Sequence, residues 1–63
     1  MIIATLIAMA LPFCEQSNKQ TQWQCQIWVA NYVAVELVRD GNLTVDGAFE
    51  NALENLPSEL QGE

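Results

Sequence analysis

Residues 21–39 are apolar around almost the whole circumference of the helix that they would form, and this feature constrains the fold most. At about 100° per residue, their apolar side chains fall into two sets on nearly opposite faces. The first set comprises Trp23, Ile27, Ala30, Ala34, Leu37 and Val38, and the second comprises Cys25, Trp28, Tyr32 and Val35. We assign the first set to the core. A helix of this kind must be buried on most sides, and a chain of 63 residues has little else to cover it.

The length of this segment and the spacing of its apolar residues predict a central helix over residues 21–40 rather than a strand, although the segment contains several valines. Asp40 and Gly41 follow its last apolar residues. We expect Gly41 to adopt the left-handed conformation that ends many helices. Arg39, near the same end, is placed favourably for the helix dipole.

Residues 1–14 form an apolar segment without a charged side chain, and we expect Pro12 to end its helix. The segment is too short to span a bilayer, which needs about 20 apolar residues. A helix packed against the rest of the chain is favoured. Insertion at a membrane interface and an export signal are the alternatives, since Ala8, Met9 and Ala10 resemble a small-x-small cleavage site. Ala4 and Ala8 also form a small-xxx-small pair that would let another helix approach closely, so both are candidate interface residues.

A third helix is predicted over residues 45–56, with Thr44 as its N-cap and Pro57 beyond its end. Its apolar stripe consists of Val45, Phe49, Ala52, Leu53 and Leu56, and its flank carries Asp46, Glu50 and Glu54 at intervals of four residues. We interpret the acidic flank as a solvated face. The predicted fold is all-α: a helical hairpin plus a short third helix, in a single small domain over residues 1–63.

The chain lacks the residues on which most catalytic sites depend. It contains no histidine, which removes the usual general base and the commonest metal ligand. Two cysteines alone cannot build a structural zinc site, and the three glycines are isolated rather than grouped in a phosphate-binding loop. We therefore expect no enzyme activity, no cofactor and no bound metal.

Cys14 and Cys25 lie symmetrically about a turn centred near residues 19–20. In a helical hairpin the two side chains come roughly opposite each other, so a disulfide between them is compatible with the geometry. Our default interpretation is a pair of buried, reduced thiols that pack as small hydrophobic groups. Two cysteines alone do not identify the compartment.

The net charge of −6, with Lys19 and Arg39 as the only basic residues, makes direct binding to nucleic acid improbable. Neutralising phosphates needs clustered lysine and arginine side chains. Attraction to an anionic membrane surface is disfavoured for the same reason. The charge favours solubility first, and it is also compatible with a basic protein partner.

Trp28, Tyr32 and Val35 form what we call the aromatic stripe, on the second face of the central helix. Aromatic residues of this kind anchor both protein cores and protein interfaces. The stripe is therefore part of the core, a candidate interface with another protein, or an aromatic belt at a lipid interface.

The function that these patterns favour is a small, acidic, non-enzymatic helical subunit or accessory protein in a larger assembly. Such a protein would act through contacts with a protein partner or by self-association. One alternative is a membrane-associated or exported peptide that uses the apolar segment 1–14. A second alternative is an acidic inhibitor that mimics nucleic acid with Asp46, Glu50 and Glu54.

Overall fold

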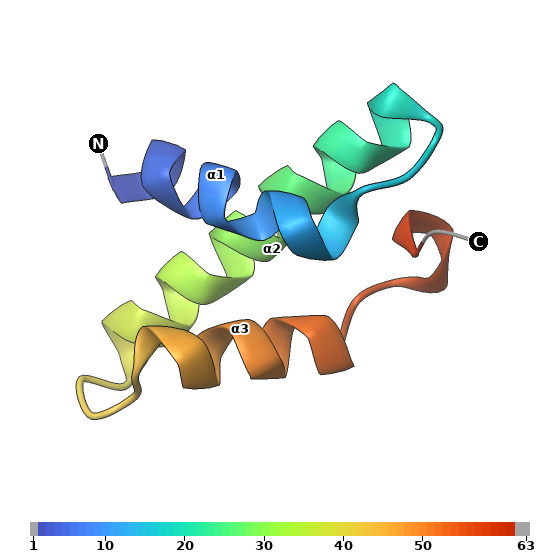
Figure 1. Cartoon of the computed structure of the whole chain (residues 1–63). Coiled ribbons are helices and arrows are strands. Elements are labelled where there is room, and N and C mark those ends of the chain that lie inside the picture. Colours follow the sequence, from blue (N-terminus) through green and yellow to red (C-terminus); the bar gives the residue numbers. More distant parts are fainter. Residues whose placement is uncertain (1, 62–63) are drawn as a thin grey trace.

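The protein is described by a computed structural model that covers residues 2–61. In this part of the chain, helices α1 (Ile2–Cys14), α2 (Lys19–Arg39) and α3 (Val45–Glu54) are followed by the single 3-10 turn η1 (Ser58–Leu60) (Figure 1). The predicted all-α fold, a helical hairpin with a short third helix, is confirmed.

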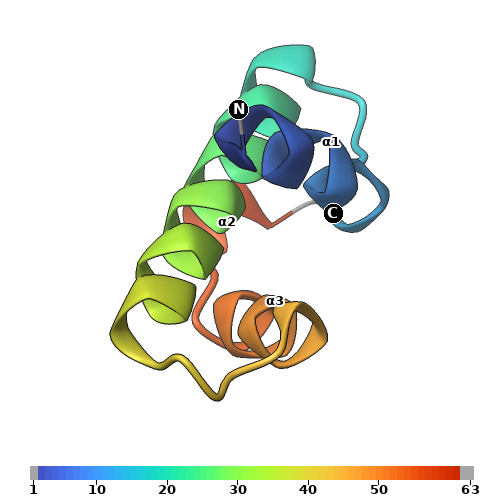
Figure 2. The same cartoon turned by 90° about the vertical axis from the view of Figure 1, so that its left-hand side faces the viewer.

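Helix α2 is the element on which the others pack. Figure 2 shows α1 and α3 on the same side of α2, one beyond the other along its length. No Cα atom of α1 lies within 8 Å of one in α3, so the backbones of these two helices stay apart. The accessible surface is 4314 Å², close to the value of about 4,000 Å² for a folded monomer of this size. The chain therefore buries about as much surface as a folded monomer does.

The core lies along the two lines where α1 and α3 cross α2, and small residues dominate it. The buried apolar residues are Leu6, Ala10, Cys14, Cys25, Val29, Ala30, Val33, Ala48, Phe49 and Ala52. Among them, Ala10, Ala30, Ala48 and Ala52 are completely inaccessible. Alanine at these points lets the helix axes approach closely, which excludes larger side chains from the crossing points.

This packing corrects the assignment of the core face of α2. Trp23 and Val38 were expected in the core, but they are 52% and 87% exposed. Val29 and Val33, which lie between the two predicted faces, are fully buried instead. Most buried residues of α2 are small or β-branched, and such residues fit beneath two crossing helices.

Both ends of α2 are fixed by side chains in the flanking turns. The Asn18 side chain accepts a hydrogen bond of 3.0 Å from the Thr21 N–H, so the helix begins at Lys19, earlier than predicted. The expectation for Gly41 is wrong, since no glycine among residues 2–61 has a positive φ. Asp40 ends the helix instead: its N–H donates to the Glu36 carbonyl, and its carboxylate accepts from the Asn42 N–H at 3.0 Å.

Helix α1 continues through Pro12 and ends at Cys14, so the prediction that Pro12 stops the helix is wrong. Pro12 lies in the last turn, where its missing N–H removes only the bond to the Ala8 carbonyl. Ala8 and Pro12 are both exposed, so water can hydrate that carbonyl. At the residue before Ala8, the buried Gln26 side chain donates to the Ile7 carbonyl at 3.0 Å and ties α2 to α1.

The prediction of Thr44 as the N-cap of α3 is confirmed by a 3.0 Å hydrogen bond from the Gly47 N–H to its hydroxyl. The helix ends at Glu54 rather than at residue 56. Beyond it, Leu60 packs against the core, and its carbonyl accepts a hydrogen bond of 3.2 Å from the Gln16 side chain. The segment after α3 is thus attached to the turn between α1 and α2.

Candidate protein-contact surfaces

Cys14 and Cys25 form a disulfide that joins the last residue of α1 to the second turn of α2. Their Cα atoms are 5.6 Å apart, and both side chains are buried. This differs from the default expectation of two reduced thiols. The bond holds the C-terminal end of α1 against α2.

Within the aromatic stripe on α2, Tyr32 lies next to the C-terminal end of α3. The rings of Trp28 and Tyr32 are stacked, with their centroids 5.2 Å apart and their planes inclined by 25°. Both side chains are partly buried against the core, whereas Val35 is 50% exposed. The Asn55 side chain donates to the Tyr32 hydroxyl at 3.2 Å, so α3 holds the tyrosine in place.

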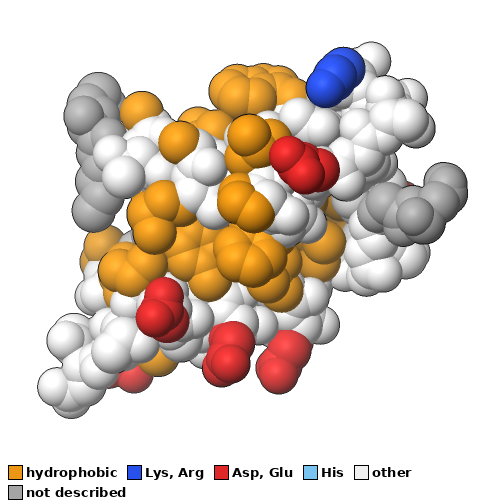
Figure 3. All heavy atoms as spheres, in the orientation of Figure 1, with side chains coloured by type: hydrophobic (Ala, Val, Ile, Leu, Met, Phe, Trp, Pro, Cys, Tyr) orange, Lys and Arg blue, Asp and Glu red, His pale blue; other side chains and the backbone are white. Residues whose placement is uncertain are grey.

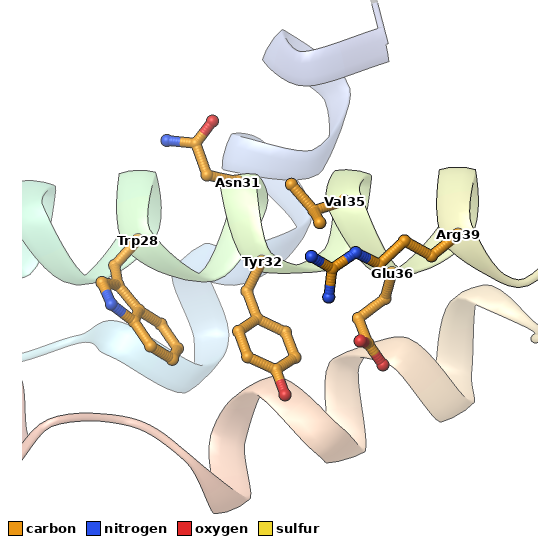
Figure 4. Close-up of a pocket in the computed structure, with 6 residues that line it drawn as sticks. All are labelled: Trp28, Asn31, Tyr32, Val35, Glu36 and Arg39. Carbon is orange, nitrogen blue, oxygen red and sulfur yellow. The ribbon is translucent and has the colours of Figure 1, made fainter.

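The aromatic stripe borders a shallow depression of about 350 Å³ on the outer side of α2 (Figure 4). Figure 4 shows the Trp28 and Tyr32 side chains pointing to one side of the helix, while Arg39 runs back along it toward Tyr32. The stripe is therefore partly buried and partly accessible. Its inner edge completes the core, and Val35 and the neighbouring helix surface stay open.

A second depression lies between α1 and α3, and we call it the interhelical groove. Its volume is about 240 Å³, and it is lined by Met9, Phe13, Asp46, Phe49, Glu50 and Leu53. The Phe13 and Phe49 rings meet across it, with centroids 5.9 Å apart and planes inclined by 33°. Phe49 is only 6% exposed, but Phe13 is 53% exposed and Met9 is 43% exposed. One wall of the groove is thus an open apolar surface.

Figure 3 shows the face of the molecule that carries this groove. Apolar side chains gather in its centre, over α1 and between α1 and α3, and acidic side chains line the edge formed by α3. Asp46, Glu50 and Glu54 are all exposed, as expected for a solvated flank. Among residues 2–61, no three His, Cys, Asp or Glu side chains gather closely enough to hold a metal ion.

The small-residue pair Ala4 and Ala8 is exposed on α1 and takes no part in the core. The small residue that α1 uses inside the chain is Ala10. The outward side of α1 thus remains accessible to a partner, and it carries no charged side chain. None of the helices among residues 2–61 is both long enough and apolar enough to cross a membrane.

The interhelical groove was not predicted as a site, although two of its residues, Asp46 and Glu50, were considered as part of an acidic surface. A signal was present in the sequence, since Met9 and Phe13 are four residues apart and lie off the line of Leu6, Ala10 and Cys14. The contact between Phe13 and Phe49 was not predictable, because it depends on how α1 and α3 are each placed on α2.

Comparison with known protein families, with curated proteins and with solved structures found no match to this chain.

The two tryptophans give a direct test of the revised core. We expect Trp23→Ala to lower the free energy of unfolding by about 1 kcal/mol, because half of this side chain is already in water. Trp28→Ala should cost about 2 kcal/mol, since it removes a ring that is packed against the core and stacked on Tyr32. Urea unfolding followed by circular dichroism measures both. If Trp23→Ala lowers the free energy of unfolding more than Trp28→Ala does, the face of α2 that carries Trp23 is the core face, as first assigned from the sequence.

Proposed function

We propose that this protein is a non-enzymatic helical subunit or accessory protein that acts through contacts with another protein chain in a larger assembly. The observation that carries the proposal is the interhelical groove, in which Phe13 and Met9 are exposed beside the buried Phe49. Large apolar side chains grouped in one depression are typical of sites that other molecules cover.

Two further features support a protein as the other molecule. The outward side of α1 continues the groove with Ala4 and Ala8, whose small side chains allow close approach of a helix. On α2, the aromatic stripe offers a second accessible surface with stacked rings of the kind that anchor interfaces. A chain with two such surfaces is suited to bridge neighbouring chains, either copies of itself or different proteins.

The experiment that tests this proposal measures the size of the protein in an extract of its native cells. We expect the wild-type chain to sediment with an assembly larger than the purified chain, and Phe13→Ala to shift a large share of it toward the free form. Truncation of a central interface aromatic commonly costs 2 kcal/mol or more of binding free energy.

Trp23→Ala is the matched control, because Trp23 is also aromatic and its exposed fraction of 52% equals that of Phe13 within one per cent. This variant should stay in the assembly. If the wild-type chain sediments as the free protein at every extract concentration, the proposed function is wrong.

A further inference from the structure

The interhelical groove has two apolar walls that are built with the same spacing. Met9 and Phe13 are four residues apart on α1, and Phe49 and Leu53 are four residues apart on α3. Residues four apart on a helix are neighbours along its axis, one turn of about 5.4 Å from each other. A ligand that fills this groove therefore needs apolar groups that repeat at about the same interval.

The charged residues at the rim of the groove are all acidic. Asp46 and Glu50 line it from α3, and Glu54 continues the row one turn further on. Among the residues that the structure describes, no lysine or arginine lines this groove: Lys19 is the first residue of α2, and Arg39 borders the aromatic stripe. Charge complementarity thus calls for a ligand with positive groups on one side of its apolar anchors.

Helices α1 and α3 do not pack directly on each other, so the space between them resembles the place of a missing helix in a helical bundle. Helices that pack directly on each other have axes about 8–10 Å apart. The Cα atoms of α1 and α3 nowhere approach within 8 Å, and the contact between these helices runs through the Phe13 and Phe49 side chains. An additional helix can lie along this gap and touch both walls.

We propose that the interhelical groove binds a basic amphipathic helix supplied by a partner protein. Its apolar side chains lie against Met9, Phe13 and Leu53, and its lysine or arginine side chains pair with Asp46 and Glu50. The inference rests on the function proposed above and names the kind of partner. Apolar anchors at positions i, i+3, i+4 and i+7 are the usual way in which a helix occupies a hydrophobic groove.

Other occupants fit these features less well. A second copy of the chain would bring another net charge of −6 to an acidic rim. The volume of about 240 Å³ is below the range of about 300–1,000 Å³ typical of small-molecule sites. An anionic lipid surface would be repelled by the row of carboxylates.

The test uses the full chain and a synthetic helical peptide of about 14 residues, long enough to run the length of α1. The peptide carries leucine at the anchor positions and lysine elsewhere. We expect its binding to perturb the backbone amide signals near Met9, Phe13 and Leu53 in nuclear magnetic resonance spectra. The signals around the aromatic stripe should not change.

Charge and apolar contacts are then separated by variants. The double variant Asp46→Asn, Glu50→Gln should weaken peptide binding about fivefold, since each exposed ion pair contributes modestly, and added salt should weaken the wild type in the same way. Phe13→Ala should weaken it by about tenfold or more. Glu15→Gln, Glu59→Gln and Trp23→Ala, which change exposed residues outside the groove, are the controls and should bind normally.

A peptide with glutamate in place of lysine should not bind, and equal binding of both peptides would overturn the proposal. Two further results would also overturn it: self-association of the purified chain that Phe13→Ala abolishes, and binding to phosphatidylcholine vesicles but not to the lysine peptide. If the native assembly persists in the groove variants, this inference fails while the proposed function stands. If no native assembly exists, the proposed function itself fails.

Discussion

Replacing Phe49 by alanine is expected to unfold most of the protein at room temperature. Phe49 is the largest buried side chain of α3, and truncation of a buried phenylalanine costs about 3–5 kcal/mol. The core of a chain this short supplies about the same amount in total. Thermal unfolding monitored by circular dichroism should show a broad, early transition with little helix left at 25 °C.

The ring partner of Phe49 provides the matched control for this change. Phe13 contacts Phe49 across the groove but is 53% exposed, so Phe13→Ala should cost about 1 kcal/mol and leave the helices in place. The same substitution, phenylalanine to alanine, on the two sides of one ring contact is thus expected to lower the free energy of unfolding by very different amounts. Similar losses for both variants would show that α3 is not anchored by Phe49.

Loss of the disulfide is expected to lower the unfolding midpoint by about 15 °C. Cys14 and Cys25 are 11 residues apart in sequence, and a disulfide that closes a loop of this size contributes about 3 kcal/mol. In a domain of this length, each kcal/mol shifts the midpoint by about 4–8 °C. The variant Cys14→Ala, Cys25→Ala and the wild type treated with a thiol reductant should unfold at nearly the same temperature.

Two measurements control for side effects of the reductant. It should not change the midpoint of the double alanine variant, which has no bond to reduce. Free-thiol titration should confirm that the wild-type bond is open under the same conditions. A wild-type midpoint that stays constant after complete reduction would show that packing alone holds α1 on α2.

The presence and the order of the helices were predictable because each helix has strong local signals. Thr44 caps α3 as expected. Residues 21–39 form a segment that is too long for a typical strand, and its apolar residues have the spacing of a helix. The orientation of α2 was not predictable in the same way. Its apolar residues surround the whole helix, so periodicity alone cannot select the inner side.

The inner side of α2 was decided by side-chain size and by a covalent link. Ala30 and Val33 fit beneath the crossing helices, while Trp23 does not. The bond from Cys14 to Cys25 then turns the Cys25 side of α2 inward, although it had been assigned to the other face. Both effects depend on tertiary contacts, and the spacing of apolar residues along a helix gives no information about such contacts.

The candidate site was predictable only in part. The aromatic stripe was identified from Trp28 and Tyr32, and the structure gives these rings a stack and a hydrogen bond from Asn55. The interhelical groove was missed because its walls come from helices that are distant in sequence and have no close backbone contact. A surface of this kind follows from the placement of α1 and α3 on a shared neighbour.

Because of the disulfide, the two walls of the groove differ in mobility: the wall formed by α1 is held more firmly than the wall formed by α3. Helix α1 is bonded covalently to α2, whereas α3 is held by packing and by side-chain hydrogen bonds such as that from Asn51 to Glu36. The free energy of local opening should therefore be smaller for α3 than for α1. A ligand that binds only when α3 is docked raises that opening free energy in proportion to the logarithm of its concentration. If the proposed partner helix binds this groove, its occupancy is coupled to the order of α3, while the disulfide-linked hairpin serves as a fixed support.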